Sequence, residues 1–92
     1  MIMSIRMKIS DINQMIVNGI KEVEVNGKTV SECIKDLITK YPALEPYIYE
    51  HKDEISPAVT IFVNGEIIPY EEVDSPVKDG DEIYPLVIIG GG

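Results

Sequence analysis

The sequence of 92 residues is poor in the side chains on which self-contained enzymes depend. Its single histidine, His51, lies in the charged stretch "HKDE" at 51–54. Its single cysteine, Cys33, lies among apolar residues and has no cysteine or histidine at metal-ligand spacing. No GxGxxG or Walker-type loop precedes a helical pattern. We therefore expect a buried, inert thiol, no catalytic side chain, no metal site, and a protein that is not an enzyme by itself.

Disulfide pairs, long apolar runs and basic residues are also scarce. One cysteine excludes an internal disulfide framework, so nothing points to secretion. No stretch approaches the roughly 18 apolar residues of a membrane-spanning helix, and "MIMSIRMKIS" is too short in its apolar run for a signal peptide. The net charge of −8 argues against nucleic acid and against anionic membranes as partners. We expect a cytoplasmic protein whose acidic residues either maintain solubility or suit a partner with a basic surface.

What is present fits one small folded domain. Hydrophobic residues make up 45% of the chain and the mean hydropathy is +0.05, which is typical of a globule rather than of a disordered acidic tail. A chain of this length has no room for a second core. We expect a single domain over 1–92, with a flexible C-terminal tail at about 86–92.

The clearest predicted element is a helix from about Thr29 to Tyr41, in "TVSECIKDLITKYP". Thr29 and Glu32 have the spacing of a capping box, and Pro42 ends the helical pattern. "ALEPYIYE" at 43–50 is compatible with a short second helical turn. The apolar residues of the main helix recur at helical spacing and form one stripe: Val30, Cys33, Ile34, Leu37, Ile38 and Tyr41.

Two strands are predicted before this helix. "IRMKI" at 5–9 and "KEVEV" at 21–25 alternate apolar and polar residues, and a turn at Asn26-Gly27 follows. Between the strands, "SDINQMIVNG" at 10–19 is ambiguous, and we expect a loop with a strand continuation there.

The strands after the helix include one interrupted by proline. "AVTIFVNGEII" at 58–68 predicts a strand, an Asn64-Gly65 turn and a shorter strand. "EIYPLVII" at 82–89 is the last candidate, although Pro85 should stop or bulge it.

This order of elements predicts an α+β domain with a mixed sheet of four or five strands and one main helix packed across it. The first and last strands are apolar enough to pair in parallel at the centre. Phe62 alternates with core positions, so we expect it on the outer side of the sheet, either as a partner anchor or covered by "PYEEVDSP" at 69–76. The sheet residues expected in the core are Val23, Val25, Val59, Ile61 and Val63.

The sequence finishes on "PLVIIGGG", an apolar run followed by three glycines. An ordinary frayed end gains nothing from exposed apolar surface, and glycine loses more freedom on ordering than any other residue. In the absence of a useful side chain, the remaining reactive group is the terminal carboxylate of Gly92, which would need activation in the active site of another protein. Without a Cβ, Gly90 and Gly91 could pass through a narrow channel. The alternative is an unstructured end without function.

Several segments, taken in order, resemble the ubiquitin-like β-grasp sulfur carriers of the MoaD/ThiS family. They are "GKTVSECIKDLITKYP", "FVNGEII", "KDGDEI" and the glycine end, and the resemblance runs from Lys21 onward. It implies that a ubiquitin-activating-type adenylyltransferase uses ATP to adenylate the last glycine. The adenylate then becomes a thiocarboxylate, which donates sulfur to molybdopterin or thiamine thiazole synthesis. The resemblance implies no stably bound cofactor.

By this resemblance Gly92 is the residue that is activated, and Gly90 and Gly91 thread into the partner. The expected partners are the activating enzyme and a synthase large subunit or other sulfur acceptor. The partner surface comprises Phe62 and the apolar approach to the glycines: Leu86, Val87, Ile88 and Ile89.

The pathway is less well defined than the family. The length and "YPALEPYI" at 41–48 favour a molybdopterin-type carrier, whereas members of that branch usually finish close to Pro-Pro-Val-Ala-Gly-Gly. A triple-glycine end is also similar to some thiamine-type carriers. We expect the small subunit of a molybdopterin synthase. The alternatives are a thiamine thiazole carrier, a ubiquitin-like modifier conjugated to lysines of target proteins, and a β-grasp interaction domain without tail chemistry.

Overall fold

A five-stranded sheet organises the structure, a computed structural model that describes residues 4–52 and 54–87. Its strand order is β2-β1-β7-β5-β6. β1 and β7 pair in parallel, and the other neighbouring strands pair antiparallel. The strands are β1 (Ile5–Lys8), β2 (Glu22–Val25), β5 (Thr60–Val63), β6 (Glu66–Ile68) and β7 (Glu82–Leu86).

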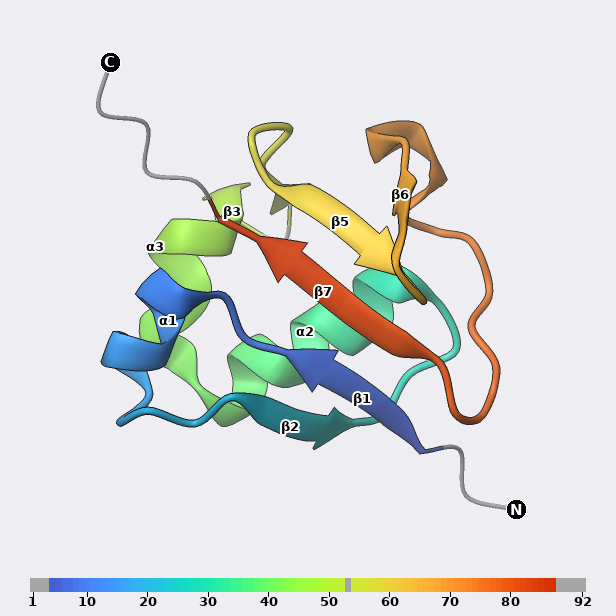
Figure 1. Ribbon diagram of the computed structural model, residues 1–92. Coiled ribbons are helices and arrows are strands. Elements are labelled where there is room, and N and C mark those ends of the chain that lie inside the picture. The colour runs from blue at the N-terminus through green and yellow to red at the C-terminus, as the bar shows by residue number, and fades with distance from the viewer. Residues whose placement is uncertain (1–3, 53, 88–92) are drawn as a thin grey trace.

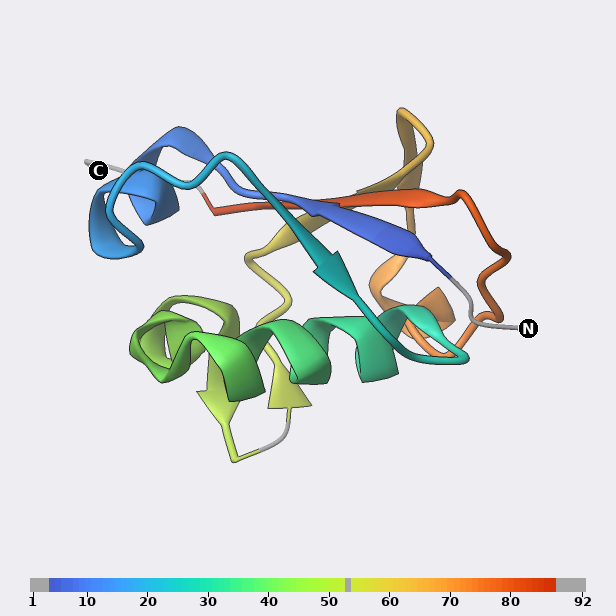
Figure 2. The same ribbon diagram turned by 90° about the horizontal axis from the view of Figure 1, so that it is seen from below.

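One main helix, α2 (Val30–Lys40), crosses one face of the sheet. It lies behind the strands in Figure 1 and beneath them in Figure 2. The predicted α+β architecture, with a mixed sheet, a helix packed across it and parallel pairing of the first and last strands, is therefore confirmed.

The ends of α2 lie where the sequence predicts them. The Glu32 N–H donates to Thr29 Oγ1 at 3.1 Å, which satisfies one of the free donors of the first turn. The Glu32 carboxylate in turn accepts from the Lys28 N–H at 3.0 Å, so it binds the residue before the cap rather than the cap itself. The helix ends at Tyr41, whose N–H donates to the Leu37 carbonyl at 2.9 Å, directly before Pro42.

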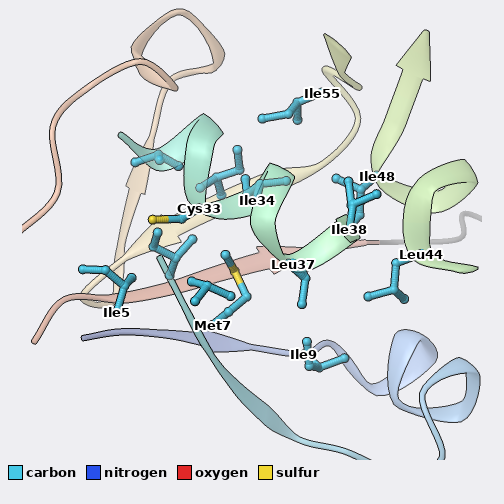
Figure 3. Close-up of a cluster of buried hydrophobic side chains, with 14 of the residues drawn as sticks. Ile5, Met7, Ile9, Cys33, Ile34, Leu37, Ile38, Leu44, Ile48 and Ile55 are labelled. Carbon is cyan, nitrogen blue, oxygen red and sulfur yellow. The ribbon is translucent and has the colours of Figure 1, made fainter. Parts of the chain in front are cut away.

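The core lies between α2 and the inner face of the sheet, as Figure 3 shows. Leu37 and Ile34 of the helix are fully buried, as are Met7 and Ile83 of the two central strands. The predicted helix stripe is buried except for Tyr41, which is half-buried. Of the sheet residues predicted in the core, Val25, Val59 and Ile61 are buried, and Val23 and Val63 are partly buried against them.

The segment at 10–19 is a helix, α1 (Asp11–Ile16), so the predicted loop with a strand continuation is wrong. Ser10 takes the extended backbone of an N-cap, and its carbonyl accepts from the Gln14 N–H at 2.9 Å. Asn18 and Gly19 both have positive φ, 58° and 80°, which ends the helix in the way glycine and asparagine commonly do. The apolar residues of this segment did not show the helical period, because α1 has fewer than two full turns.

The charged stretch after α2 is more ordered than predicted. The expected short helical turn is present as a 3-10 turn, η1 (Pro42–Leu44), followed by α3 (Glu45–Ile48). Where the sequence predicts only a charged loop, β3 (Tyr49–His51) and β4 (Glu54–Ile55) form a small antiparallel sheet. Tyr49 pairs with Ile55, and Ile55 is buried, so these apolar side chains attach the hairpin to the core.

β7 starts at a hydrogen-bonded corner. The Asn64 N–H donates to the Glu82 carbonyl at 2.8 Å, and the Glu82 N–H donates to Asn64 Oδ1 at 2.9 Å. Asn64 Nδ2 donates to Asp81 Oδ1 at 2.9 Å. Asn64 and Gly65 have φ values of 52° and 84°, as the predicted turn between β5 and β6 requires. This corner fixes the register of β7 against β5.

Pro85 neither stops nor bulges β7, contrary to the prediction. It is buried and lies opposite Ile61 in an unbroken ladder. Hydrogen-bonded and non-hydrogen-bonded pairs alternate in an antiparallel ladder. Because the Asn64–Glu82 pair is hydrogen-bonded, the Ile61–Pro85 pair three positions along falls at a non-hydrogen-bonded site. Pairing with β1 ends at Ile83, two residues before Pro85, so β7 continues past the proline only along β5.

Truncation of Leu37 tests the position of the helix. Leu37→Ala should lower the free energy of unfolding by about 2–5 kcal/mol, because it removes a fully buried side chain between α2 and the sheet. Ile67→Ala is a matched control, since Ile67 is 65% exposed and should change stability by about 0.5 kcal/mol or less. Equilibrium unfolding in urea measures both. Equal midpoints for the two variants would contradict this packing.

Candidate functional site

The outer face of the sheet, opposite α2, is the first candidate surface. Along β7, Ile83 and Pro85 are buried, so the alternating residues Tyr84 and Leu86 lie on the outer face. Phe62 is the ladder partner of Tyr84, and the two rings stack with centroids 5.9 Å apart and planes inclined by 28°. The prediction that Phe62 lies on the outer side is confirmed, although its side chain is half-buried rather than exposed.

Two more apolar side chains extend this pair across the sheet. Ile67 of β6 is paired with Phe62 and is 65% exposed. Leu86 is paired with Thr60 and is half-buried. We call Phe62, Ile67, Tyr84 and Leu86 the outer patch. Sequence reasoning missed Ile67 and Tyr84; the register across the Asn64-Gly65 turn and the alternation in "EIYPL" could have identified them.

The loop at 69–76 does not cover the outer patch. It contains a 3-10 turn, η2 (Tyr70–Glu72), and lies beside the start of α2. The Val30 N–H donates to the Ser75 carbonyl at 3.1 Å, and the Ser31 N–H donates to the Val73 carbonyl at 2.8 Å. Figure 2 shows η2 on the same side of the sheet as α2. The predicted alternative, in which this loop covers Phe62, is wrong.

Charged side chains lie next to the outer patch. Arg6 and Lys8 of β1 each form an ion pair of 3.7 Å with Glu82 of β7. Lys8 and Tyr84 line a hollow of about 260 Å³ together with Gln14 and Lys21. The outer face therefore combines an apolar half over β5–β7 with a half that carries basic groups, in a chain whose net charge is −8.

The path toward the last residues starts at the centre of the sheet. Leu86, predicted as the first residue of the tail, is the last residue of β7. Val87 is partly buried against the core. The remaining predicted site residues, Ile88, Ile89, Gly90, Gly91 and Gly92, lie outside the described residues. Val87 is the described residue that precedes them, and it directly follows Leu86 of the outer patch.

The nucleophile and imidazole candidates lie apart from this surface. Cys33 is fully buried on α2, and burial, followed by the nearby charges of Asp36, Glu32 and Asp81, raises the pKa of its thiol to about 11. His51 is exposed at the end of β3. Within residues 4–52 and 54–87, no three histidine, cysteine, aspartate or glutamate side chains are arranged to hold a metal ion.

No helix among the described residues is both long and apolar enough to cross a membrane.

Comparisons with known proteins identify relatives along nearly the whole chain. The family model described as "ThiS family" matches residues 9–92. A protein of Archaeoglobus fulgidus named "Putative sulfur carrier protein" is 30% identical over 93 residues, which cover 98% of this chain and 100% of that protein.

Solved structures share the fold. The solution structure of small archaeal modifier protein 1 from Methanosarcina acetivorans is 28% identical, with a TM-score of 0.84 over 100% of this chain and 99% of that chain. A chain in the crystal structure of the Amycolatopsis orientalis BexX/CysO complex is 26% identical, with a TM-score of 0.79 over 96% of this chain and 99% of that one. The structure is therefore a ubiquitin-like β-grasp domain, as predicted.

The buried thiol predicts a loss of stability at alkaline pH. Because the pKa of Cys33 is raised from 9.0 to about 11 in the folded protein, the unfolded chain loses this proton first as the pH rises. The contribution of the protonated thiol to the free energy of unfolding is fully present below about pH 9, and it is lost as the pH rises through the folded-state pKa. Between pH 9 and pH 11, the free energy of unfolding of the wild type should therefore fall by about 2 kcal/mol more than that of Cys33→Ala. Urea unfolding at a series of pH values measures both. Parallel pH profiles for the two proteins would contradict this assignment.

Proposed function

The chain belongs to the ThiS family, and we propose that it is a sulfur carrier whose Gly92 carboxylate is adenylated and then converted to a thiocarboxylate. The observation that carries the proposal is the placement of the outer patch. β7, the strand that precedes the glycines in the sequence, carries an apolar surface that includes two stacked aromatic rings. A partner that binds this surface would receive the end of the chain at a defined point.

The proposed chemistry has two steps, both catalysed by a ubiquitin-activating-type enzyme. In the first, a carboxylate oxygen of Gly92 attacks the α-phosphorus of ATP, and pyrophosphate leaves. In the second, a hydrosulfide-type sulfur bonds to the carbonyl carbon, AMP leaves with the electrons of the broken C–O bond, and a proton is released. The chain contributes the carboxylate and the docking surface. ATP binds to the enzyme, so the chain itself holds no cofactor.

The outer patch is proposed as the docking surface for the activating enzyme. Aromatic residues often dominate binding energy when they pack at the centre of an interface. Ile67 is exposed at the rim of the stacked pair. Because an extended chain spans at most about 3.3–3.6 Å per residue, the five residues beyond Val87 can reach about 16–18 Å into a recessed nucleotide site.

For the sulfur acceptor we propose molybdopterin synthesis, with this chain as the small subunit of the synthase and the large subunit as its second partner. Two features support molybdopterin synthesis as the pathway. They are the length of the chain and the segment "YPALEPYI" at 41–48, which forms η1 and α3. Thiamine thiazole synthesis is the alternative acceptor. A cytoplasmic location stays a prediction with this proposal.

A second candidate function is conjugation to lysines of target proteins. The observation that favours it is the 28% identity, over the whole chain, to a protein called a small archaeal modifier. The same adenylate serves both functions, and they differ in the nucleophile that attacks it. Intact mass spectrometry of protein from its native host separates them. A mass increase equal to the exchange of one oxygen for sulfur supports the carrier, whereas conjugates that resist hydrolysis support the modifier.

Deletion of Gly92 tests the tail chemistry. The deletion should leave urea unfolding unchanged, because the sheet, the helices and the core of residues 4–52 and 54–87 do not include this residue. It should abolish ATP–pyrophosphate exchange by the cognate activating enzyme, since the carboxylate is then displaced by one residue. A variant with one residue added after Gly92 should behave in the same way. Exchange retained by either variant would overturn the carrier proposal.

Removal of the Phe62 ring tests the docking surface separately. Phe62→Ala should raise the KM for the carrier in the exchange assay by at least about ten-fold, as expected for an aromatic anchor. It should cost about 1–2 kcal/mol of stability, since the ring is half-buried and stacks on Tyr84. Tyr47→Ala, at a residue 39% exposed on α3, is the matched aromatic control and should leave KM unchanged. Equal KM values for the two variants would exclude Phe62 as an anchor.

A further inference from the structure

A second hollow lies away from the outer patch, on the α2 side of the molecule. It has a volume of about 270 Å³ and is lined by residues from three separate parts of the chain: α2, the β3–β4 hairpin and the segment at 70–74 that contains η2. Small-molecule sites in proteins usually occupy about 300–1,000 Å³, so this hollow lies at the small end of the range. None of the sulfur-carrier chemistry proposed above uses this surface.

Apolar and aromatic groups form the inner part of the hollow. Ile55 of β4 is buried, and Figure 3 shows it on the side of α2 that faces away from β1. Val73 and Tyr49 are partly buried against the core, and Tyr70 is 42% exposed. Two tyrosines from different elements therefore line the hollow over an apolar base.

Charged groups surround this aromatic interior, and most of them are acidic. Glu32, Glu54 and Asp74 line the hollow, against the single ammonium group of Lys35. Asp74 is held in place by the Ser31 hydroxyl, which donates to its Oδ1 at 2.8 Å. Among the described residues, neither Glu54 nor Lys35 takes part in an ion pair. Glu54 therefore presents an unpaired carboxylate beside an aromatic side chain.

We propose that this hollow binds an arginine side chain presented by a partner protein. A guanidinium group is planar and weakly hydrated, so it stacks on aromatic faces and binds carboxylates in a bidentate way. In the bound state it would lie against the tyrosine rings and pair with Glu54, with Asp74 adding a second negative charge. The excess of carboxylates in the hollow and the net charge of −8 make the surface complementary to a basic partner segment.

The position of the hollow allows the carrier to bind two partners at once. α2 and η2 lie on the opposite side of the sheet from the outer patch (Figure 2), so an occupant of the hollow would not cover Phe62. The arginine site is thus independent of the proposed activation of Gly92, and either proposal can fail without the other.

Titration of ¹⁵N-labelled full-length protein with acetyl-Gly-Arg-Gly-amide tests the proposal, in salt close to physiological strength to screen diffuse attraction. We expect saturable chemical-shift changes centred on the hollow, at Lys35, Tyr49, Glu54 and Val73. The same peptide with citrulline, which is isosteric but neutral, should give no saturable change. The lysine peptide should bind more weakly than the arginine peptide, because it lacks the planar group. Equal response to arginine and citrulline, or equal binding of arginine and lysine, would overturn the proposal.

Two variants and a control locate the contact. Glu54→Gln should raise the Kd of the arginine peptide about two- to five-fold, as expected for one exposed ion pair. Tyr70→Ala should raise it by a similar factor through loss of stacking. Glu66→Gln, at an exposed carboxylate on β6 outside the hollow, should leave Kd unchanged. Identical Kd values for Glu54→Gln and Glu66→Gln would overturn the assignment. Chemical shifts at the hollow that change with protein concentration in the absence of peptide would also overturn the assignment. They would show that a second copy of the chain occupies the hollow.

Discussion

The parallel pairing of β1 with β7 is the constraint on which the rest of the structure depends. It places β7 in the middle of the sheet, with β1 on one side and β5 on the other. Both faces of β7 are then used. Ile83 and Pro85 pack toward α2, and Tyr84 and Leu86 complete the outer patch. Because the residues that lead to the glycines continue from this strand, the core and the proposed site share one element.

The two faces of the sheet carry different kinds of stabilisation. The inner face is a packed aliphatic core in which helix α2 supplies a continuous stripe. The outer face combines one stacked aromatic pair with ion pairs from Arg6 and Lys8 to Glu82, which are partly exposed and contribute little to stability. An outer surface held in this way can exchange internal contacts for contacts with a partner at small cost. The inner face cannot.

Much of the fold could be predicted from the sequence, because its signals are local and strong. The capping pair Thr29 and Glu32, the helical stripe and the Asn64-Gly65 turn each specify an element within a few residues. Helix α1 was missed for a local reason, because it has fewer than two turns, whereas the error at Pro85 arose from an interaction that is distant in sequence. Pro85 fits its strand only because Asn64, across the sheet, sets which ladder positions lack hydrogen bonds. In the outer patch, Phe62 was found from alternation, and the same alternation in β7 and the register across the Asn64-Gly65 turn would also have given Tyr84 and Ile67.

Among the elements of the described residues, the central strand is also the last to be synthesised. Every other strand and helix of the described residues precedes β7 along the chain, yet β1 and β5 become neighbours of the same strand only when β7 lies between them. Contacts between the first and last strands have the greatest sequence separation in the domain, and such contacts slow folding because loop closure must precede them. The sheet of the nascent chain therefore stays open until β7 emerges.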